Sequence, residues 1–446
     1  MERLTRREFL KLVGAGTAWI MLGGCVQPPS VTPTPTTPQA TKELKIGIIS
    51  YRTGPLAMFG EPFHHASDYI ADLLNSAGGI GGFKLKILHE DQGSTASETV
   101  EKAKKLILED KVDVITGIPS TGHSLGVAPV CDSNNVLYLQ VQARPEYGTW
   151  RDIDNPSKGI FDWVFQTGNS TTSHALQYVH IVKELYPEVK TIAQIHPDYA
   201  YGYDIYNIFT SALKKLKPGL EFFDPLYPKL FTPDYTPYIN ELLRMKPDLI
   251  YVGLWGTDFT RFVDQLLPYG LLKGTGGKTI LAGFWDYYPS IGREVPIYGH
   301  PQASNQGLFD YPGYKEVIKT IVWHYKTYGW FQTGGTGDAF AALYILKAAV
   351  EKVYKEKGEV PTRDEIRDAL ENIGKVVTPL GEAVMRKEDH RTLWSVECGN
   401  VVKDTYGYFE GVETAWIYDP KNKIVLPPEK HEPPAFKKGP EWIATW

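Results

Sequence analysis

Short apolar runs alternate with longer amphipathic stretches along most of the chain. Residues 44–50 (LKIGIIS), 112–116 (VDVIT) and 136–139 (VLYL) are largely apolar and rich in β-branched side chains. This composition is typical of strands that are buried on both faces of a parallel sheet. The stretches between the runs repeat apolar residues about every 3.6 positions, which predicts helices. The alternation indicates a parallel sheet covered by helices on both faces.

The alternating pattern occurs twice. The first series is predicted as strand 44–50, helix 61–75, strand 84–89, helix 96–109, strand 112–116 and strand 136–139. The second is predicted as strand 191–195, helix 203–216, strand 249–252, helix 257–267 and strand 279–281, with a further helix over 337–354. Two such series predict two doubly wound α/β lobes. Because ligands of these sheets bind beyond the carboxyl ends of the strands, we expect a cleft lined by loops of both lobes.

Length and composition fit this interpretation and exclude several classes of protein. A chain of 446 residues is too long for one ordinary core, and 42% apolar with 22% charged residues is typical of a folded globular protein. The net charge of −5 provides no basic surface for nucleic acid. The histidines show no metal-ligand spacing, so neither a metal nor a cofactor is predicted.

The chain has three cysteines, Cys25, Cys131 and Cys398, too few for a disulfide scaffold. Cys25 lies in the N-terminal segment discussed next. Cys131 and Cys398 can either form one bridge or remain two unpaired thiols, because the sequence does not give the Cα separation that a bridge requires.

The first forty residues have the pattern of an export signal. Residues 5–11 (TRREFLK) resemble a twin-arginine signal, and the apolar stretch 12–22 is too short to span a bilayer. Residues 22–25 (LGGC) resemble a lipobox, which implies a diacylglyceryl group on Cys25. Residues 26–43 are rich in Pro and Thr and predict an extended tether. The mature protein is therefore expected outside the cytoplasm, anchored to the outer face of the membrane; the alternative is an uncleaved amphipathic anchor.

Several segments, in order, resemble type I periplasmic binding proteins of the leucine/isoleucine/valine-binding group. They include residues 50–60 (SYRTGPLAMFG), 75–83 (NSAGGIGGF), 195–202 (IHPDYAYG) and 247–253 (PDLIYVG). The resemblance covers residues 44 to 395. It implies two doubly wound parallel-sheet lobes, joined by a three-segment hinge, that close on an amino acid or another small carboxylate. It also implies a monomeric, non-enzymatic protein that delivers this ligand to an ABC permease.

The resemblance implies the division of the chain into lobes. Lobe 1 is expected to comprise residues 44–165 and 308–375, and lobe 2 residues 166–307 and 376–446. After about residue 400 the sequence, rich in Tyr, Pro and Lys, departs from the usual length of the group and has no predicted role.

The resemblance also implies ligand contacts from lobe 1. Ser120, Thr121 and Gly122 match the loop that offers hydroxyl and N–H groups to a ligand carboxylate, and a helix N-terminus suits an anion. Gln142, Ala143 and Arg144 match a segment in which a hydroxyl usually binds the same carboxylate. Arg144 replaces that hydroxyl. It can clamp a ligand carboxylate through two hydrogen bonds, or pair with a neighbouring acid and only shape the cleft.

Aromatic residues dominate the contacts implied elsewhere in the cleft. Tyr201 matches the tyrosine that covers the ligand from lobe 2, and Trp255 and Trp285 match side-chain contacts. Asp286 matches the acid that binds an ammonium group. Phe59 is expected to close the cleft from lobe 1, since such rings hold apolar bodies.

Two other functions are alternatives to transport. A secreted enzyme on a similar scaffold lacks support, because we find no Gly-x-Ser-x-Gly elbow, no His-Glu-x-x-His pair and no phosphate-binding glycine loop. A sensory module that passes ligand occupancy to a membrane receptor would use the same fold and cleft. The sequence does not identify the ligand.

Overall fold

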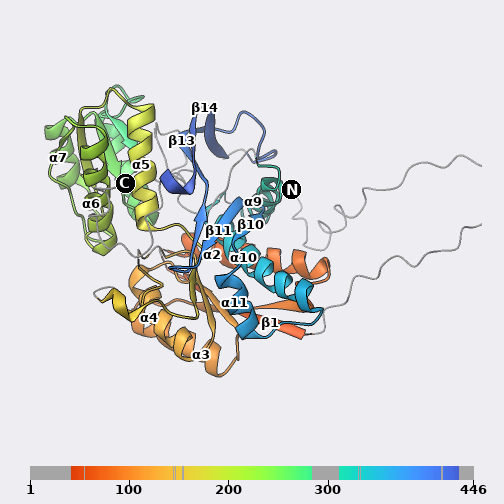
Figure 1. Cartoon of the computed structure of the whole chain (residues 1–446). Helices are drawn as coiled ribbons and strands as arrows, with labels where there is room; N and C mark the ends of the chain where they lie inside the picture. Colours follow the sequence, from red (N-terminus) through yellow and green to blue (C-terminus); the bar gives the residue numbers. More distant parts are fainter. Residues whose placement is uncertain are drawn as a thin grey trace, which may run out of the picture.

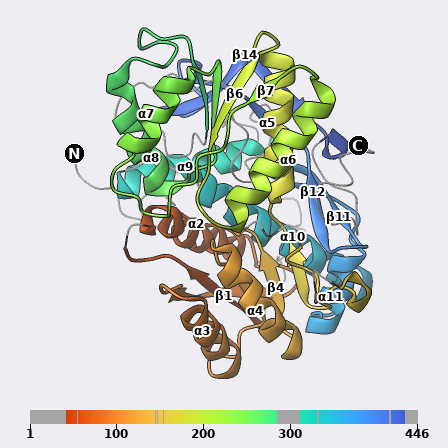
Figure 2. The ribbon, with the colours of Figure 1, turned by 90° about the vertical axis from the view of Figure 1, so that its left-hand side faces the viewer.

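The computed structural model of the chain describes residues 42–54, 56–143, 145, 147–152, 155–283, 311–329, 331, 333–412 and 415–430, with the side chains of Phe59 and Pro156 excepted. The described part consists of two α/β lobes (Figure 1). Figure 2 shows lobe 2, drawn mainly in green, above lobe 1, drawn in orange and brown with α10, α11, β11 and β12 in teal to blue. This is the predicted fold class.

Lobe 1 is built on an eight-stranded sheet in the order β10-β11-β12-β5-β4-β3-β1-β2. Its strands are β1 (Lys42–Ser50), β2 (Phe83–Asp91), β3 (Val114–Gly117), β4 (Leu137–Gln140), β5 (Val164–Gln166), β10 (Lys375–Thr378), β11 (Gly381–Arg386) and β12 (Arg391–Trp394). Its helices are α2 (Ala57–Ser76), α3 (Ala96–Leu108), α4 (Thr121–Ser133), α9 (Tyr314–Tyr328), α10 (Gly334–Lys357) and α11 (Arg363–Glu371). The apolar run 44–50 forms most of β1. Burial of every residue in β3 and β4 explains why these strands are largely apolar.

Lobe 2 has a parallel four-stranded sheet in the order β7-β6-β8-β9. Its strands are β6 (Thr191–Ile195), β7 (Glu221–Phe222), β8 (Leu249–Val252) and β9 (Ile280–Ala282). Its helices are α5 (Thr171–Leu185), α6 (Ala200–Leu216), α7 (Thr236–Met245) and α8 (Gly256–Leu266). Figure 2 shows α5 and α6 on one side of this sheet and α7 and α8 on the other.

The C-terminal part of the described chain belongs to lobe 2. The strands β13 (Val396–Lys403) and β14 (Trp416–Leu426) form an antiparallel pair that packs on α5. The Tyr186 hydroxyl bonds the Asn400 side chain, and a ring nitrogen of His180 lies 3.0 Å from the Lys430 carbonyl oxygen. The segment beyond residue 400, which had no predicted role, thus covers a helix of lobe 2.

One predicted lobe boundary needs correction. Residues 376–394 were assigned to lobe 2, but β10, β11 and β12 extend the sheet of lobe 1. Parallel pairing of β12 with β5 joins this hairpin to the rest of the sheet. The chain therefore crosses to lobe 2 after Trp394, beside its earlier crossing after Gln166.

The structure decides whether Cys131 and Cys398 form a disulfide bridge. Cys131 lies in the core between the lobe 1 sheet and its helices α3 and α4, whereas Cys398 lies in β13. Both are buried and free, so they do not form a bridge. Burial raises the pKa of both thiols, which makes them inert.

Candidate functional site

The parallel strands of lobe 1 end together at the edge that faces lobe 2. In the register of the sheet, Ile49 pairs with Gly117, and Gly117 pairs with Gln140. The residues that follow β1, β3 and β4 therefore meet at one edge. In lobe 2, Ile195 pairs with Val252, which brings together the segments after β6 and β8.

The turn after β3 presents the N-terminus of α4. Ile118 has a φ of +58°, a strained conformation for a β-branched residue, and its N–H donates to the Ile49 carbonyl at 2.6 Å. Ser120 precedes the helix, and its side chain makes no capping hydrogen bond. Gly122 is exposed, and a Cβ built on it would meet nothing within 4 Å. The first N–H groups of α4 are thus available to an anion.

Gln142 adds a hydrogen-bond donor beside this helix. Its side chain is 2% exposed, and its Oε1 accepts a bond from the Ser50 Oγ at 2.6 Å. Among the described residues, its Nε2 has no hydrogen-bond partner. An unsatisfied buried donor costs about 1–3 kcal/mol, which a ligand oxygen would recover. Ala143, the next residue, is buried as well.

Tyr51, which sequence analysis had not selected, contacts the same helix end. Its hydroxyl forms a hydrogen bond with the side chain of Ser120. Burial, reinforced by the nearby Asp91 carboxylate, raises the pKa of Tyr51 to about 12, although the bond to Ser120 acts in the opposite direction. The phenol therefore stays neutral at physiological pH and keeps its proton for hydrogen bonding.

Lobe 2 contributes an aromatic pair. Trp255 and Tyr199 directly precede α8 and α6, and the Trp255 Nε1–H donates to the Tyr199 hydroxyl at 3.0 Å. Burial raises the pKa of Tyr199, with smaller contributions from Tyr51 and Asp258. Since Tyr51 belongs to lobe 1, its contribution to the pKa of Tyr199 acts across the two lobes.

A second contact brings the lobes together at α2. Gly256, the first residue of α8, has a φ of +58°, and a Cβ built on it would lie 3.5 Å from the Leu56 Cδ2. Figure 2 shows α8 above α2 at this junction. Leu56, just before α2, is buried.

The structure places some of the predicted site residues together and leaves others outside its description. Ser120, Thr121, Gly122, Gln142 and Ala143 gather at the edge of lobe 1, and Trp255 lies at the edge of lobe 2. Arg144, Trp285, Asp286 and the lipidation residue Cys25 lie outside the described residues, as does the side chain of Phe59. The expected roles of these five residues stay predictions.

Tyr201 lies at the start of α6, and its expected role in covering the ligand stays a prediction. It is buried in the hydrophobic core and contributes electrostatically to raising the pKa of Tyr251, a buried residue of β8. Its ring stacks on Tyr199 with centroids 5.8 Å apart. Tyr199 thus connects Tyr201 with Trp255. The sequence could have indicated Tyr51 and Tyr199 by their position, because each lies in the loop after a predicted strand.

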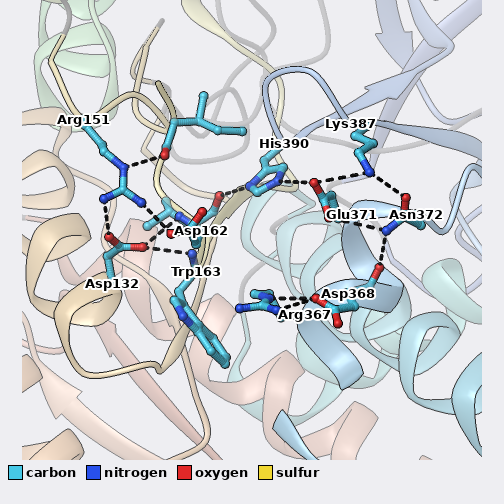
Figure 3. Close-up of polar contacts among 12 residues, drawn as sticks. Asp132, Arg151, Asp162, Trp163, Arg367, Asp368, Glu371, Asn372, Lys387 and His390 are labelled. Carbon is cyan, nitrogen blue, oxygen red and sulfur yellow. Dashed lines mark hydrogen bonds and ion pairs between the residues drawn. The ribbon is translucent and has the colours of Figure 1, made fainter. Parts of the chain in front are cut away.

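A network of charged residues lies at the other end of lobe 1 (Figure 3). Arg151 pairs with Asp132 and Asp162 at 3.3 and 2.6 Å, and Arg367 pairs with Asp368 at 2.5 Å. The residues beside this network line a pocket of about 390 Å³, namely Ile160, Asp162, Arg367, Asp368, Glu371 and His390. The Trp163 N–H donates to Asp132 of α4, the His390 Nδ1 lies 3.1 Å from the Val164 carbonyl oxygen, and the His390 Nε2 lies 3.9 Å from the Glu371 carboxylate. The network therefore connects α4, the β11–β12 turn and α11.

Within the described ranges, no group of three or more His, Cys, Asp or Glu side chains is arranged to hold a metal ion. The helices of the same ranges include none with the length and apolar character needed to cross a membrane.

Comparisons with known proteins agree with the geometry. A family model described as periplasmic binding protein matches residues 43–403. A curated Leu/Ile/Val-binding protein homologue from Brucella melitensis is 23% identical over 398 residues, which cover 85% of this chain and 88% of the relative.

Two solved structures show the same fold. A solute-binding protein of an ABC transporter from Rhodopseudomonas palustris, in complex with p-hydroxybenzoic acid, superposes with a TM-score of 0.69 at 18% identity, covering 87% of this chain and 98% of that one. A leucine-binding protein from Thermotoga maritima superposes with a TM-score of 0.67 at 16% identity, covering 86% and 99%.

Proposed function

The chain belongs to the periplasmic binding protein family, and we propose that it serves an ABC importer as a lipid-anchored substrate-binding protein that captures a small carboxylate between its lobes. Members of this family are solute-binding proteins rather than enzymes. The observation that carries the proposal is the group of unsatisfied donors at the edge of lobe 1, opposite an aromatic pair of lobe 2.

The donors suit a carboxylate. The N-terminus of α4 offers backbone N–H groups and the positive end of the helix dipole, and Gln142 offers a buried amide N–H beside it. Bonds from such donors to a charged oxygen are stronger than those between neutral groups. Arg144, which follows Gln142 in sequence, would add a guanidinium if it faces the ligand.

The facing rings suit an apolar or aromatic body. Tyr51 from lobe 1, with Tyr199 and Trp255 from lobe 2, provides flat surfaces that hold a ring or a branched aliphatic group. The similar Rhodopseudomonas protein was crystallised with p-hydroxybenzoic acid, and the similar Thermotoga protein is a leucine-binding protein. We therefore propose an amino acid or an aromatic acid as the ligand. Asp286 would favour the amino acid by binding its ammonium group.

The two-lobed architecture supports the proposal of capture and delivery. Lobes joined by crossing segments close about a hinge when a ligand bridges them, and the closed form is the one that docks on a permease. The sequence TRREFLK and Cys25 support export and anchoring at the outer face of the membrane. Replacing Cys25 by Ala should release the protein from the membrane fraction into the soluble fraction.

A thermal-shift screen of the purified protein tests the ligand class. Each probe carboxylate, such as leucine or p-hydroxybenzoate, is paired with its amide, which has the same body without the charge. A ligand that binds only the folded state at 100 times its Kd stabilises that state by about 2.7 kcal/mol and so raises the melting temperature. We expect one carboxylate class to raise it and the matched amides to have little effect. A flat response to the whole panel, or stabilisation by the amides alone, would refute the proposal.

A further inference from the structure

The pocket beside the charged network of lobe 1 contains a buried nitrogen atom without a partner. This pocket of about 390 Å³ lies at the amino ends of β5 and β12, whereas the ligand edge lies at the carboxyl ends of the parallel strands. His390 lines the pocket and is 4% exposed. Among the described residues, its Nε2 has no hydrogen-bond partner. Buried polar atoms without a partner are uncommon in folded proteins, so this nitrogen calls for an explanation.

The ring of His390 is held in one orientation. Its Nδ1 lies 3.1 Å from the Val164 carbonyl oxygen, and the ring stacks on Phe165 with centroids 4.2 Å apart. Because a carbonyl only accepts hydrogen bonds, the proton of the neutral ring is on Nδ1. Burial lowers the pKa of His390, against smaller contributions from the Val164 carbonyl and nearby carboxylates, so the ring is neutral at physiological pH. The Nε2 atom therefore presents a lone pair to the pocket.

This lone pair faces a carboxylate. The Nε2 lies 3.9 Å from the Glu371 Oε1, and Figure 3 shows the His390 ring directed towards Glu371. Neither atom donates, so they do not bond each other, but a group with several N–H donors could bond both. His390 also has a φ of +53°, which is costly for a residue with a Cβ. Backbone strain thus coincides with an unsatisfied buried atom, a combination that is typical of functional sites.

The other two acids of the pocket lining are paired within the protein. The Arg367 Nε and Nη2 donate to the Asp368 Oδ1, and the guanidinium lies 5.0 Å from the centre of the Trp163 ring. Arg151 divides its charge between Asp162 and Asp132, at 2.6 and 3.3 Å. These pairs leave Glu371 as the acid of the lining with the weakest partner.

Glu371 has a weak partner and lies at an unfavourable place for a negative charge. The Lys387 Nζ lies 3.5 Å from its Oε1, but the lysine side chain is 58% exposed, and such pairs contribute little. Glu371 is the last residue of α11, whose last turn contains no basic residue. The carbonyl groups of a helix C-terminus carry a partial negative charge, so a carboxylate is disfavoured there and a cation is favoured.

We propose that this pocket is a second binding site, which takes a small organic cation through a primary ammonium group. The ammonium donates to the His390 Nε2 and to the Glu371 carboxylate, and its charge offsets the negative end of α11. A volume of about 390 Å³ is in the range of small-molecule sites. A metal ion fits less well, because no three His, Cys, Asp or Glu side chains of the described ranges are arranged to hold one. The site is separate from the ligand edge and does not depend on the proposed function.

Nuclear magnetic resonance of the full chain, labelled with ¹⁵N in histidine, tests the site with a chelator present to remove metal ions. In the free protein we expect the His390 Nδ1 to be protonated and its Nε2 to be unprotonated. Titration with n-butylamine should shift the Nε2 signal, because the ammonium group donates to this atom. The alcohol n-butanol has the same chain without the charge and should have little effect. A protonated Nε2 in the free protein, or equal responses to both probes, would overturn the proposal.

Variants locate the bound amine. In Glu371→Gln the dissociation constant for n-butylamine should rise about 10-fold, because the charged acceptor is lost, while the melting temperature of the free protein should not fall. His390→Asn keeps a side-chain donor for the Val164 carbonyl and tolerates the positive φ, but it lacks Nε2 and should bind about 3- to 10-fold more weakly. Glu388→Gln, an exposed position of the same turn outside the pocket lining, should bind like the wild type.

Three results would contradict the site. If n-butylamine leaves the His390 signal unchanged, water alone satisfies the Nε2 atom and the pocket does not bind amines. If Glu371→Gln binds as tightly as the wild type, the amine lies elsewhere. If Glu388→Gln loses as much affinity as Glu371→Gln, the amine responds only to the overall charge of lobe 1.

Discussion

At the scale of single residues, the lobe 1 side of the site is built from donors without an internal acceptor. The Ser50 hydroxyl holds the oxygen of the Gln142 amide, which leaves the nitrogen turned to the other side. The Ser120 side chain forms a hydrogen bond with Tyr51 and makes no capping bond to α4. Both arrangements leave N–H groups for an incoming anion.

Gln142→Glu keeps the oxygen that accepts from Ser50 and removes the amide N–H that we expect to bind the ligand. Its Oε1 can still accept from Ser50, but a carboxylate oxygen replaces the free N–H and repels a ligand carboxylate. We expect affinity for the carboxylate found in the screen to fall about 10- to 100-fold, because a bond to a charged group contributes about 1.5–3 kcal/mol. Isothermal titration measures the loss. An unchanged Kd would show that the Gln142 amide does not face the ligand.

Gly122→Ala tests whether the space beside α4 belongs to the ligand. The added Cβ meets nothing within 4 Å, and alanine is the better helix former by roughly 0.5–1 kcal/mol, so the free protein should become slightly more stable. The same methyl group should hinder the ligand and weaken its binding. Urea unfolding and titration measure the two effects. If stability and affinity both rise, the ligand does not pass over Gly122.

The sequence predicted which loops form this site better than it predicted which residues of those loops take part. The residues after β3 and β4 were predicted through the family resemblance, in agreement with the rule that ligands bind beyond the carboxyl ends of parallel strands. Tyr51 and Tyr199 were missed because the sequence does not show which of several neighbouring tyrosines points into the core. In the segment 199–201, the start of α6 turns Tyr201 inward and leaves Tyr199 beside Trp255.

At the scale of elements, the hydrophobic pattern predicted the buried strands well and the helix ends less well. The helix predicted over 61–75 extends over Ala57–Ser76, although Gly60 and Pro62 are typical helix breakers. Tertiary contact explains Gly60, since a Cβ there would lie 2.0 Å from the Tyr51 carbonyl oxygen. The lobe boundary near residue 375 was wrong because β10 alternates buried and exposed residues in the manner of any edge strand.

The capping box of α11 gives an element-scale prediction about acid. The Glu365 carboxylate accepts from Lys357 and from the Thr362 N–H, and these bonds, Lys357 first, lower its pKa to about 2. A depressed pKa stabilises the fold above the ordinary value of 4.5, and this contribution is lost as the pH falls towards about 2. Glu365→Gln should therefore lower the free energy of unfolding at pH 7, with a difference from wild type that shrinks as the pH falls from about 5 to about 3.

Urea titrations at several pH values measure that difference. Glu356→Gln, on an exposed position of α10, controls for the loss of one negative charge. A difference that stays constant with pH would mean that the carboxylate charge of Glu365 does not stabilise the helix end.

At the scale of the whole molecule, the two lobes meet through side chains that no local pattern connects. The Leu56 Cδ2 lies 3.5 Å from where a Gly256 Cβ would be, and Tyr51 lies close enough to Tyr199 to raise its pKa. Sequence periodicity predicted two lobes and a cleft, but not this junction, because it depends on the angle between two separately folded bodies.

Leu56→Ala tests whether the junction holds the lobes together. A contact that exists only when the lobes are closed stabilises the closed form relative to the open one, and apparent affinity falls with the fraction of molecules that are closed. We expect the variant to bind ligand about 3- to 10-fold more weakly and the free protein to show a larger radius of gyration in small-angle X-ray scattering. Leu125→Ala, on the exposed face of α4 in the same lobe, should change neither quantity. If Leu56→Ala binds normally and keeps the wild-type radius, the junction does not set the balance between open and closed forms, and closure must depend on the ligand alone.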